Sequence, residues 1–93
     1  MQYKLALSEQ AEQAILDACL WYEEQRSGLG KEFLIAVKNS LISIQSNPLL
    51  YGYRKKKIRG HHMQRFPYVI FFVVDKEEIF VTSVLHTSRK PKI

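Results

Sequence analysis

The run Tyr68–Val74 constrains the fold of this chain more than any other stretch. It consists of aromatic and β-branched residues, and it shows no polar alternation beyond Tyr68. A strand with one face in water alternates apolar and polar residues, whereas a strand covered on both faces does not. The sequence therefore predicts that this run is a central strand of a sheet.

A basic segment, residues 54–65, comes just before this strand. Six of its twelve positions are Lys or Arg. Residues 1–50 carry four Lys or Arg and six Asp or Glu, a net of −2, whereas residues 51–93 carry ten and three, a net of +7. A cationic half attracts polyanions or an acidic partner, although a basic surface can also serve solubility alone. The clustering favours a binding surface.

The N-terminal half predicts one strand and two helices. Residues 2–7 alternate in polarity, which is typical of a half-buried strand. Ser8 is a favourable N-cap, and apolar residues then recur at helical spacing from about Glu9 to Arg26. After the glycines at 28 and 30, a second periodic run extends from Leu29 to the break at Asn47-Pro48. We expect an antiparallel helical hairpin whose apolar face covers a sheet.

The C-terminal half predicts three strands that form an antiparallel meander. They lie at about 56–66, 68–74 and 79–86, and the strand at residues 2–7 joins this sheet at an edge. The expected fold is α+β in the order β-α-α-β-β-β, with the helical hairpin packed on one face of a mainly antiparallel sheet. A chain of 93 residues allows one domain and one core, so we expect a single domain over 1–93.

Several classes of protein are excluded by composition. No apolar run reaches the roughly 18–20 residues that a membrane span needs, and the N-terminal residues lack the apolar core of a secretory signal. The single cysteine, Cys19, cannot form an internal disulfide. We therefore expect a cytoplasmic protein. His61 and His62 are adjacent in a strand and point to opposite faces, so we expect no metal and no cofactor.

The order of elements and several short motifs resemble the RelE/ParE toxin superfamily of type II toxin–antitoxin systems, and the resemblance covers essentially the whole chain. The motifs are Trp21-Tyr22-Glu23, Gly28-Leu29-Gly30-Lys31-Glu32-Phe33, Asn47-Pro48, Arg65-Phe66-Pro67-Tyr68 and His86-Thr87-Ser88-Arg89-Lys90-Pro91. The resemblance implies a bacterial growth-inhibiting toxin, of the kind also called plasmid stabilisation proteins, that is neutralised by a cognate antitoxin.

The superfamily has two branches with different targets. RelE-like members cut mRNA in the ribosomal A site, and ParE-like members poison DNA gyrase. RelE-like chemistry usually needs Lys and Arg on the sheet and a Tyr near the C-terminus. No Tyr follows Tyr68 in this sequence, and the chain leaves no room for a further C-terminal helix. The resemblance thus favours the ParE-like branch, with the RelE-like endonuclease and a non-toxic, antitoxin-binding member as alternatives.

Four residues are candidates for catalysis if the protein cleaves RNA. Metal-free cleavage needs an acid and a base, and cations that stabilise the phosphorane charge. Alternation in the strand 56–66 would place Lys57, Arg59, His61, Met63 and Arg65 on one face. If the last strand lies beside it, His86 and Arg89 could join Arg59 and Arg65 around one phosphate. The alternative for Arg65 is an ion pair with an acidic residue of the first helix.

Other residues are candidates for binding the target or the antitoxin; they are Lys55, Lys56, Lys57, His61 and Trp21. In this case the cationic sheet docks an acidic antitoxin segment or a surface of gyrase, and no reaction is catalysed. The alternative for the three lysines is a solvated strand edge that prevents aggregation. The alternative for Trp21 is packing under the loop at residues 48–53.

Overall fold

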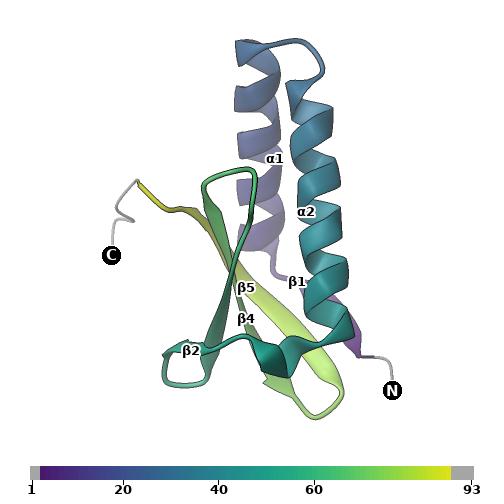
Figure 1. Cartoon of the computed structure of the whole chain (residues 1–93), viewed down its shortest axis with the longest axis vertical. Helices are drawn as coiled ribbons and strands as arrows, with labels where there is room; N and C mark the ends of the chain where they lie inside the picture. The colour runs from purple at the N-terminus through teal and green to yellow at the C-terminus, as the bar shows by residue number, and fades with distance from the viewer. Residues whose placement is uncertain (1–2, 89–93) are drawn as a thin grey trace.

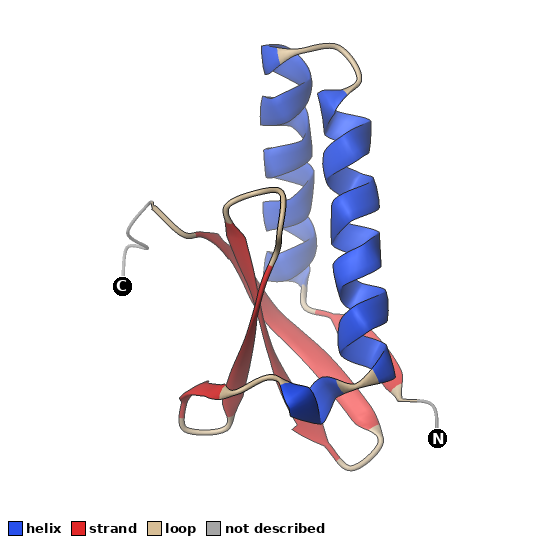
Figure 2. Cartoon of the chain, in the orientation of Figure 1, coloured by secondary structure: helices blue, strands red, loops and turns tan. Residues whose placement is uncertain are grey.

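The protein consists of two antiparallel helices packed on one face of a five-stranded sheet (Figures 1 and 2). The computed structural model describes residues 3–88. The elements in chain order are β1 (Lys4–Leu7), α1 (Glu9–Gln25), α2 (Leu29–Ser46), the short 3-10 helix η1 (Pro48–Leu50), β2 (Tyr53–Lys55), β3 (Ile58–His62), β4 (Tyr68–Asp75) and β5 (Glu78–His86). Neither helix is long and apolar enough to cross a membrane, within this described part of the chain.

The sheet has the strand order β1-β5-β4-β3-β2. Strand β1 lies at one edge and runs parallel to β5, and all other neighbours are antiparallel. The predicted α+β fold, with a mainly antiparallel sheet and an N-terminal strand at its edge, is confirmed. Strand β1 is joined to α1 by Ser8, whose backbone N–H donates to the Val81 carbonyl at 3.0 Å and whose hydroxyl donates to the Thr82 carbonyl at 3.0 Å.

Strand β4 is central, as predicted, but its two faces are not equally covered. Tyr68, Ile70 and Phe72 face the helices and are buried. On the opposite face Val69 is buried, whereas Phe71 and Val73 are only half-buried. The absence of polar alternation in this strand therefore reflects one fully covered face and one apolar face that the helices leave open.

The predicted strand at 56–66 is wrong in its bounds. The chain instead forms two short strands, β2 and β3, joined by a turn at Lys56 and Lys57. Lys56 adopts a positive φ of 51°, which suits a tight hairpin turn. The register of β2 against β3 shifts between Tyr53 and Lys55, so the pairing of these two strands is irregular.

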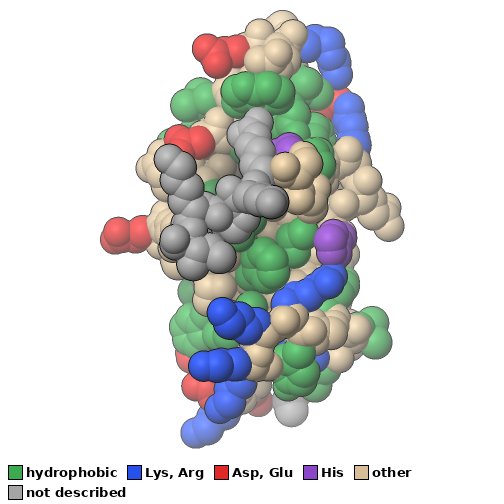
Figure 3. Space-filling view, turned by 90° about the vertical axis from the view of Figure 1, so that its left-hand side faces the viewer, with side chains coloured by type: hydrophobic (Ala, Val, Ile, Leu, Met, Phe, Trp, Pro, Cys, Tyr) green, Lys and Arg blue, Asp and Glu red, His purple; other side chains and the backbone are tan. Residues whose placement is uncertain are grey.

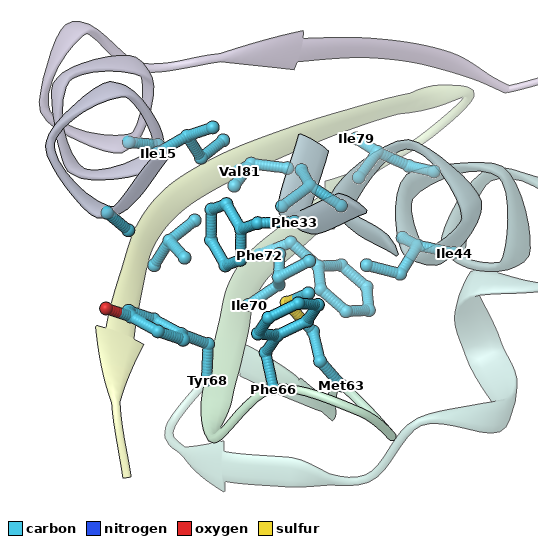
Figure 4. Packing of buried hydrophobic residues seen from close by; sticks show 14 residues of the cluster. Ile15, Phe33, Ile44, Met63, Phe66, Tyr68, Ile70, Phe72, Ile79 and Val81 are labelled. Carbon is cyan, nitrogen blue, oxygen red and sulfur yellow. The ribbon is translucent and has the colours of Figure 1, made fainter. Parts of the chain in front are cut away.

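The second half of the predicted strand is a loop. Residues 63–67 leave the sheet because Met63 and Phe66 turn into the core, where both are buried (Figure 4). Phe66 stacks edge-on against Phe33 at 5.2 Å between ring centres and against Tyr22 at 4.9 Å. Lys57, Met63 and Arg65 therefore do not share a strand face with Arg59 and His61.

The two helices approach each other closely where α2 begins. The Glu23 carboxylate of α1 accepts hydrogen bonds from the backbone N–H groups of Gly28 at 3.0 Å and Gly30 at 3.0 Å. The Glu23 carboxylate thus pairs with backbone N–H groups at the start of α2 that have no partner within that helix, and its negative charge complements the positive end of the α2 dipole. A Cβ atom on Gly30 would lie 2.8 Å from the Cys19 carbonyl oxygen, so glycine is required by this close approach.

We expect Gly30→Ala to lower the free energy of unfolding by about 1–3 kcal/mol, because the added methyl forces the two helices apart. Chemical denaturation measures this change. Gly52→Ala is the matched control, since nothing lies within 4 Å of a Cβ atom at that position. Equal stability of the two variants would contradict the close approach of the helices.

Candidate functional site

The basic hairpin, which we define as residues 53–62, carries the densest positive charge in the described chain. Arg54, Lys55, Lys56 and Lys57 are all exposed and follow one another from β2 into the turn. Figure 3 shows Lys and Arg side chains gathered in the lower part of one face of the molecule, below a hydrophobic area. The predicted cationic surface therefore exists, but a tight turn presents it and not a long strand.

Gly60 allows one of these cations to lie flat on the sheet. A Cβ atom at Gly60 would be 2.8 Å from the Arg54 Cγ atom and 3.4 Å from the Val69 Cγ1 atom. The aliphatic part of Arg54 thus occupies the space above Gly60, on the face away from the helices. Burying the stem of a long side chain while its charge stays in water is favourable.

Arg59 of β3 is held by groups of the protein itself. Its Nη1 donates to the Tyr51 carbonyl at 2.6 Å, and its Nη2 donates to the Tyr53 hydroxyl at 2.9 Å. The guanidinium carbon lies 4.1 Å from the centre of the Tyr53 ring, at cation–π distance. Arg59 therefore ties β2 and the segment after η1 to β3.

Arg65, in the loop between β3 and β4, forms an ion pair with Glu32. The sequence suggested an acidic partner in the first helix, but Glu32 belongs to the first turn of α2. Arg26 lies 3.5 Å from the same carboxylate. The hydrogen bond from Arg65, the strongest of several influences, lowers the pKa of Glu32 from its usual value.

His86 lies at the end of β5, opposite Tyr68 of β4, with 5.1 Å between the two ring centres. Its Nδ1 atom lies 3.2 Å from the Ser88 backbone nitrogen, which donates to it. Arg59 is instead paired with Phe72. Phe72 and Tyr68 are four residues apart on β4, which corresponds to about 13 Å along the strand, and β4 itself separates β3 from β5 by about 10 Å. Arg59 and His86 therefore lie far apart on the sheet.

The structure therefore does not bring the described catalytic candidates together. The condition that the last strand lies beside the basic one is not met, because β4 lies between them. Arg59 contacts the segment at 51–53, Arg65 contacts α2, and His86 contacts Tyr68. Arg89 falls outside the described residues. Among residues 3–88, His, Cys, Asp and Glu side chains form no group of three that could hold a metal ion.

A cleft that the sequence analysis missed lies between α2 and β3, and we call it the α2–β3 cleft. It has a volume of about 580 Å³. Its lining residues come from both sides of the cleft: Glu32, Ile35, Ala36, Asn39, Ser40, Ser43, Tyr51, His61, His62, Met63, Gln64 and Arg65. No local pattern could have revealed it, because it depends on how far the helical hairpin extends over the sheet.

His61 is a lining residue of this cleft and is half-buried there. Its ring meets the Tyr51 ring edge-on at 4.8 Å between centres. The Nδ1 atom is buried and has no hydrogen-bond partner. Burial, and to a lesser degree the neighbouring His62, lowers the pKa of His61 from its usual value of 6.5.

Trp21, the remaining binding candidate, lies on α1 and is 44% exposed. Its ring packs edge-on against Tyr22 at 5.1 Å. Leu16 and Leu20 of the same helix are also exposed, at 51% and 57%. A role of Trp21 in partner binding stays a prediction.

The depressed pKa of His61 predicts a dependence of stability on pH. The unfolded chain binds a proton to this residue more readily than the folded protein does, so the free energy of unfolding falls as the pH drops below about 6.5. The Tyr51 ring packs against His61, and His62 is adjacent to it in the chain. Thermal denaturation between pH 7.5 and pH 5 measures the effect.

Two variants separate this contribution from those of other titrating groups. His61→Phe should lose much of the pH dependence in this range, whereas His62→Gln should keep most of it, because burial is the main cause of the shift. An unchanged profile in His61→Phe would contradict the assignment.

Comparisons with known proteins agree with this fold. A family model described as "ParE toxin of type II toxin-antitoxin system, parDE" matches residues 5–91. The fold is similar to a chain of the chromosomal ParDE toxin–antitoxin system from P. aeruginosa, with a TM-score of 0.71, 15% identity, and coverage of 92% of this chain and 97% of that one. No curated protein matches the sequence.

Two solved structures of E. coli proteins are also similar. The isolated RelE toxin has a TM-score of 0.62 and 18% identity, with coverage of 95% of this chain and 87% of that one. A chain of the intact RelBE toxin–antitoxin complex has a TM-score of 0.60 and 17% identity, with coverage of 94% and 99%.

Proposed function

The chain belongs to the ParE toxin family of type II toxin–antitoxin systems, and from that membership we propose that it inhibits growth by acting on DNA gyrase and that a cognate antitoxin neutralises it. One structural observation supports a gyrase poison over an RNA-cleaving toxin. The guanidinium groups of Arg59 and Arg65 are bound to acceptors within the protein. That of Arg59 is bound to the segment at 51–53, and that of Arg65 is bound to α2. A phosphorane would need cations and an acid–base pair converging on one point.

The basic hairpin supplies the attraction to the target or to an acidic partner. Lys55, Lys56 and Lys57 are exposed, so their charge acts at long range. Such charges mainly raise the rate of association and do not position atoms for a reaction.

A growth assay tests the proposal first. Expression of this chain alone in bacteria should slow growth, and co-expression of the protein encoded by the adjacent reading frame should restore it. Purified protein added to gyrase and plasmid should then trap cleaved DNA. Cuts in mRNA at codon positions on translating ribosomes, without an effect on gyrase, would instead identify a RelE-like endonuclease. Unimpaired growth with good expression would identify a non-toxic, antitoxin-binding member.

We expect the variant Lys55→Gln, Lys56→Gln, Lys57→Gln to associate about tenfold more slowly with its acidic partner at low salt, because three steering charges are lost. The difference from the wild type should shrink as salt rises, since salt screens exposed charges. Stopped-flow or surface-binding kinetics measure the rate.

The matched control is Lys4→Gln, Lys31→Gln, Lys38→Gln, which removes the same charge from three exposed lysines in the other half of the chain. An equal loss of rate in both variants would show that net charge matters and that the position of the hairpin does not.

A further inference from the structure

The three most exposed large hydrophobic side chains of the described chain all lie within residues 49–53. They are Leu50, Tyr53 and Leu49, which are 74%, 61% and 58% exposed. We call these three residues the apolar tip, and none of them belongs to the hydrophobic core. A single exposed leucine on a surface needs no explanation, but a group of highly exposed apolar residues marks an interaction site.

The short helix η1 holds the two leucines of the apolar tip in solvent. In a 3-10 helix, side chains three positions apart lie on the same side. Pro48 is fully buried, and Tyr51 is half-buried with its ring against His61. These two side chains therefore occupy the inner side of η1, and Leu49 and Leu50 are left on the outer side. Because the scaffold already fixes their backbone, the leucines lose little conformational freedom when they bind a partner.

The apolar tip lies next to the basic hairpin, and no acidic residue of the same segment offsets its charge. Residues 47–65 contain no Asp or Glu. Figure 1 shows η1 and the turn between β2 and β3 at the same end of the molecule. Arg59 fixes the two to each other, because its Nη1 donates to the Tyr51 carbonyl at 2.6 Å. A partner of this end of the molecule therefore meets apolar side chains and cations together.

This combination fits a protein surface better than a nucleic acid or a membrane. Contacts with the backbone of a nucleic acid go to phosphate and sugar, which offer no apolar surface to leucine. An anionic membrane accepts both leucine and lysine. However, the turn between β4 and β5 lies at the same end (Figure 1), and its residues Asp75, Glu77 and Glu78 are exposed. A flat anionic surface repels these acids, whereas a protein partner contacts the tip and the hairpin alone.

The shape of the apolar tip indicates that its partner is folded before it binds. A short peptide segment binds in a groove of the protein that recognises it. The leucines of the tip are instead anchors that project into solvent, and anchors of this kind fill pockets of the other protein. The hollow therefore belongs to the partner, and only a folded partner provides one.

We propose that the apolar tip and the basic hairpin together engage a folded target protein, at an apolar hollow bordered by Asp and Glu side chains. Leu49 and Leu50 enter the hollow, and Lys55, Lys56 and Lys57 lie against the carboxylates. This inference rests on the proposed function, since it requires that the toxin acts on a protein. It adds the surface that contacts the target and the chemistry of the site that receives it.

A pair of double variants tests the role of the leucines. With purified gyrase and plasmid, Leu49→Ser, Leu50→Ser should need at least about tenfold more protein than the wild type for half-maximal trapping of cleaved DNA. The matched control is Leu16→Ser, Leu20→Ser on α1, where the side chains are 51% and 57% exposed. The control should stay within about threefold of the wild type. Both variants should keep the wild-type unfolding midpoint, because all four side chains are exposed.

Two further binding measurements separate the target from other partners. The tip variant should bind the protein encoded by the adjacent reading frame within about threefold of the wild type. The wild type should not sediment with vesicles of phosphatidylcholine and phosphatidylglycerol. Loss of antitoxin binding together with loss of activity on gyrase would assign the tip to the antitoxin and overturn the inference. Vesicle binding that the tip variant loses would assign it to a membrane and overturn the inference as well.

The outcomes also distinguish this inference from the proposed function. Full activity of the tip variant on gyrase overturns the inference and leaves the proposed function intact. If the wild type slows growth without acting on gyrase, the choice of gyrase fails, and growth then decides the inference: the tip variant should no longer slow growth, and the α1 control should still do so. If the wild type does not slow growth at all, the proposed function and the inference fail together.

Discussion

Burial of β4 against the helices is the interaction on which the other parts of this protein depend. Ile70 and Phe72 are fully buried, and each contributes about 1.5–3 kcal/mol through removal of its side chain from water. The same core requires Met63 and Phe66, which lie outside any strand (Figure 4). To bury them, the chain leaves β3 after His62. That departure carries Arg65 to α2, where it meets Glu32, and it forms one wall of the α2–β3 cleft.

The general architecture could be predicted from sequence because its signals are local. The apolar run at 68–74, the periodicity of the two helices and the N-cap Ser8 each act over a few residues, and each predicts an element that the structure contains, although one face of β4 is less covered than its sequence indicates. The ends of β3 could not be predicted in this way. Strict alternation places Met63 on the same strand face as Arg59 and His61, whereas its burial requires the chain to leave the strand and turn toward the helices, which lie far away in the sequence.

The candidate site was harder to predict than the fold, because the roles of its arginines depend on distant neighbours. Arg59 is bound to Tyr51 and Tyr53, and Arg65 is bound to Glu32, 33 residues earlier in the chain. Composition showed that the C-terminal half is cationic, but it could not show which of the cations contact the rest of the fold and which stay in solvent. The structure divides it into arginines that brace the fold and lysines that remain in solvent, which is consistent with the different chemistry of the two side chains.

The parallel pairing of β1 with β5 has a consequence for the synthesis of this protein. Ser8 is hydrogen-bonded to Thr82, 74 residues later, so the first strand has no partner until almost all of the described chain has left the ribosome. The apolar residues of α1 that pack on β5 wait equally long. Contacts of such sequence separation slow folding. A growing chain of this toxin therefore keeps apolar surface exposed until β5 has been synthesised, and this delay limits how early the folded surfaces can act.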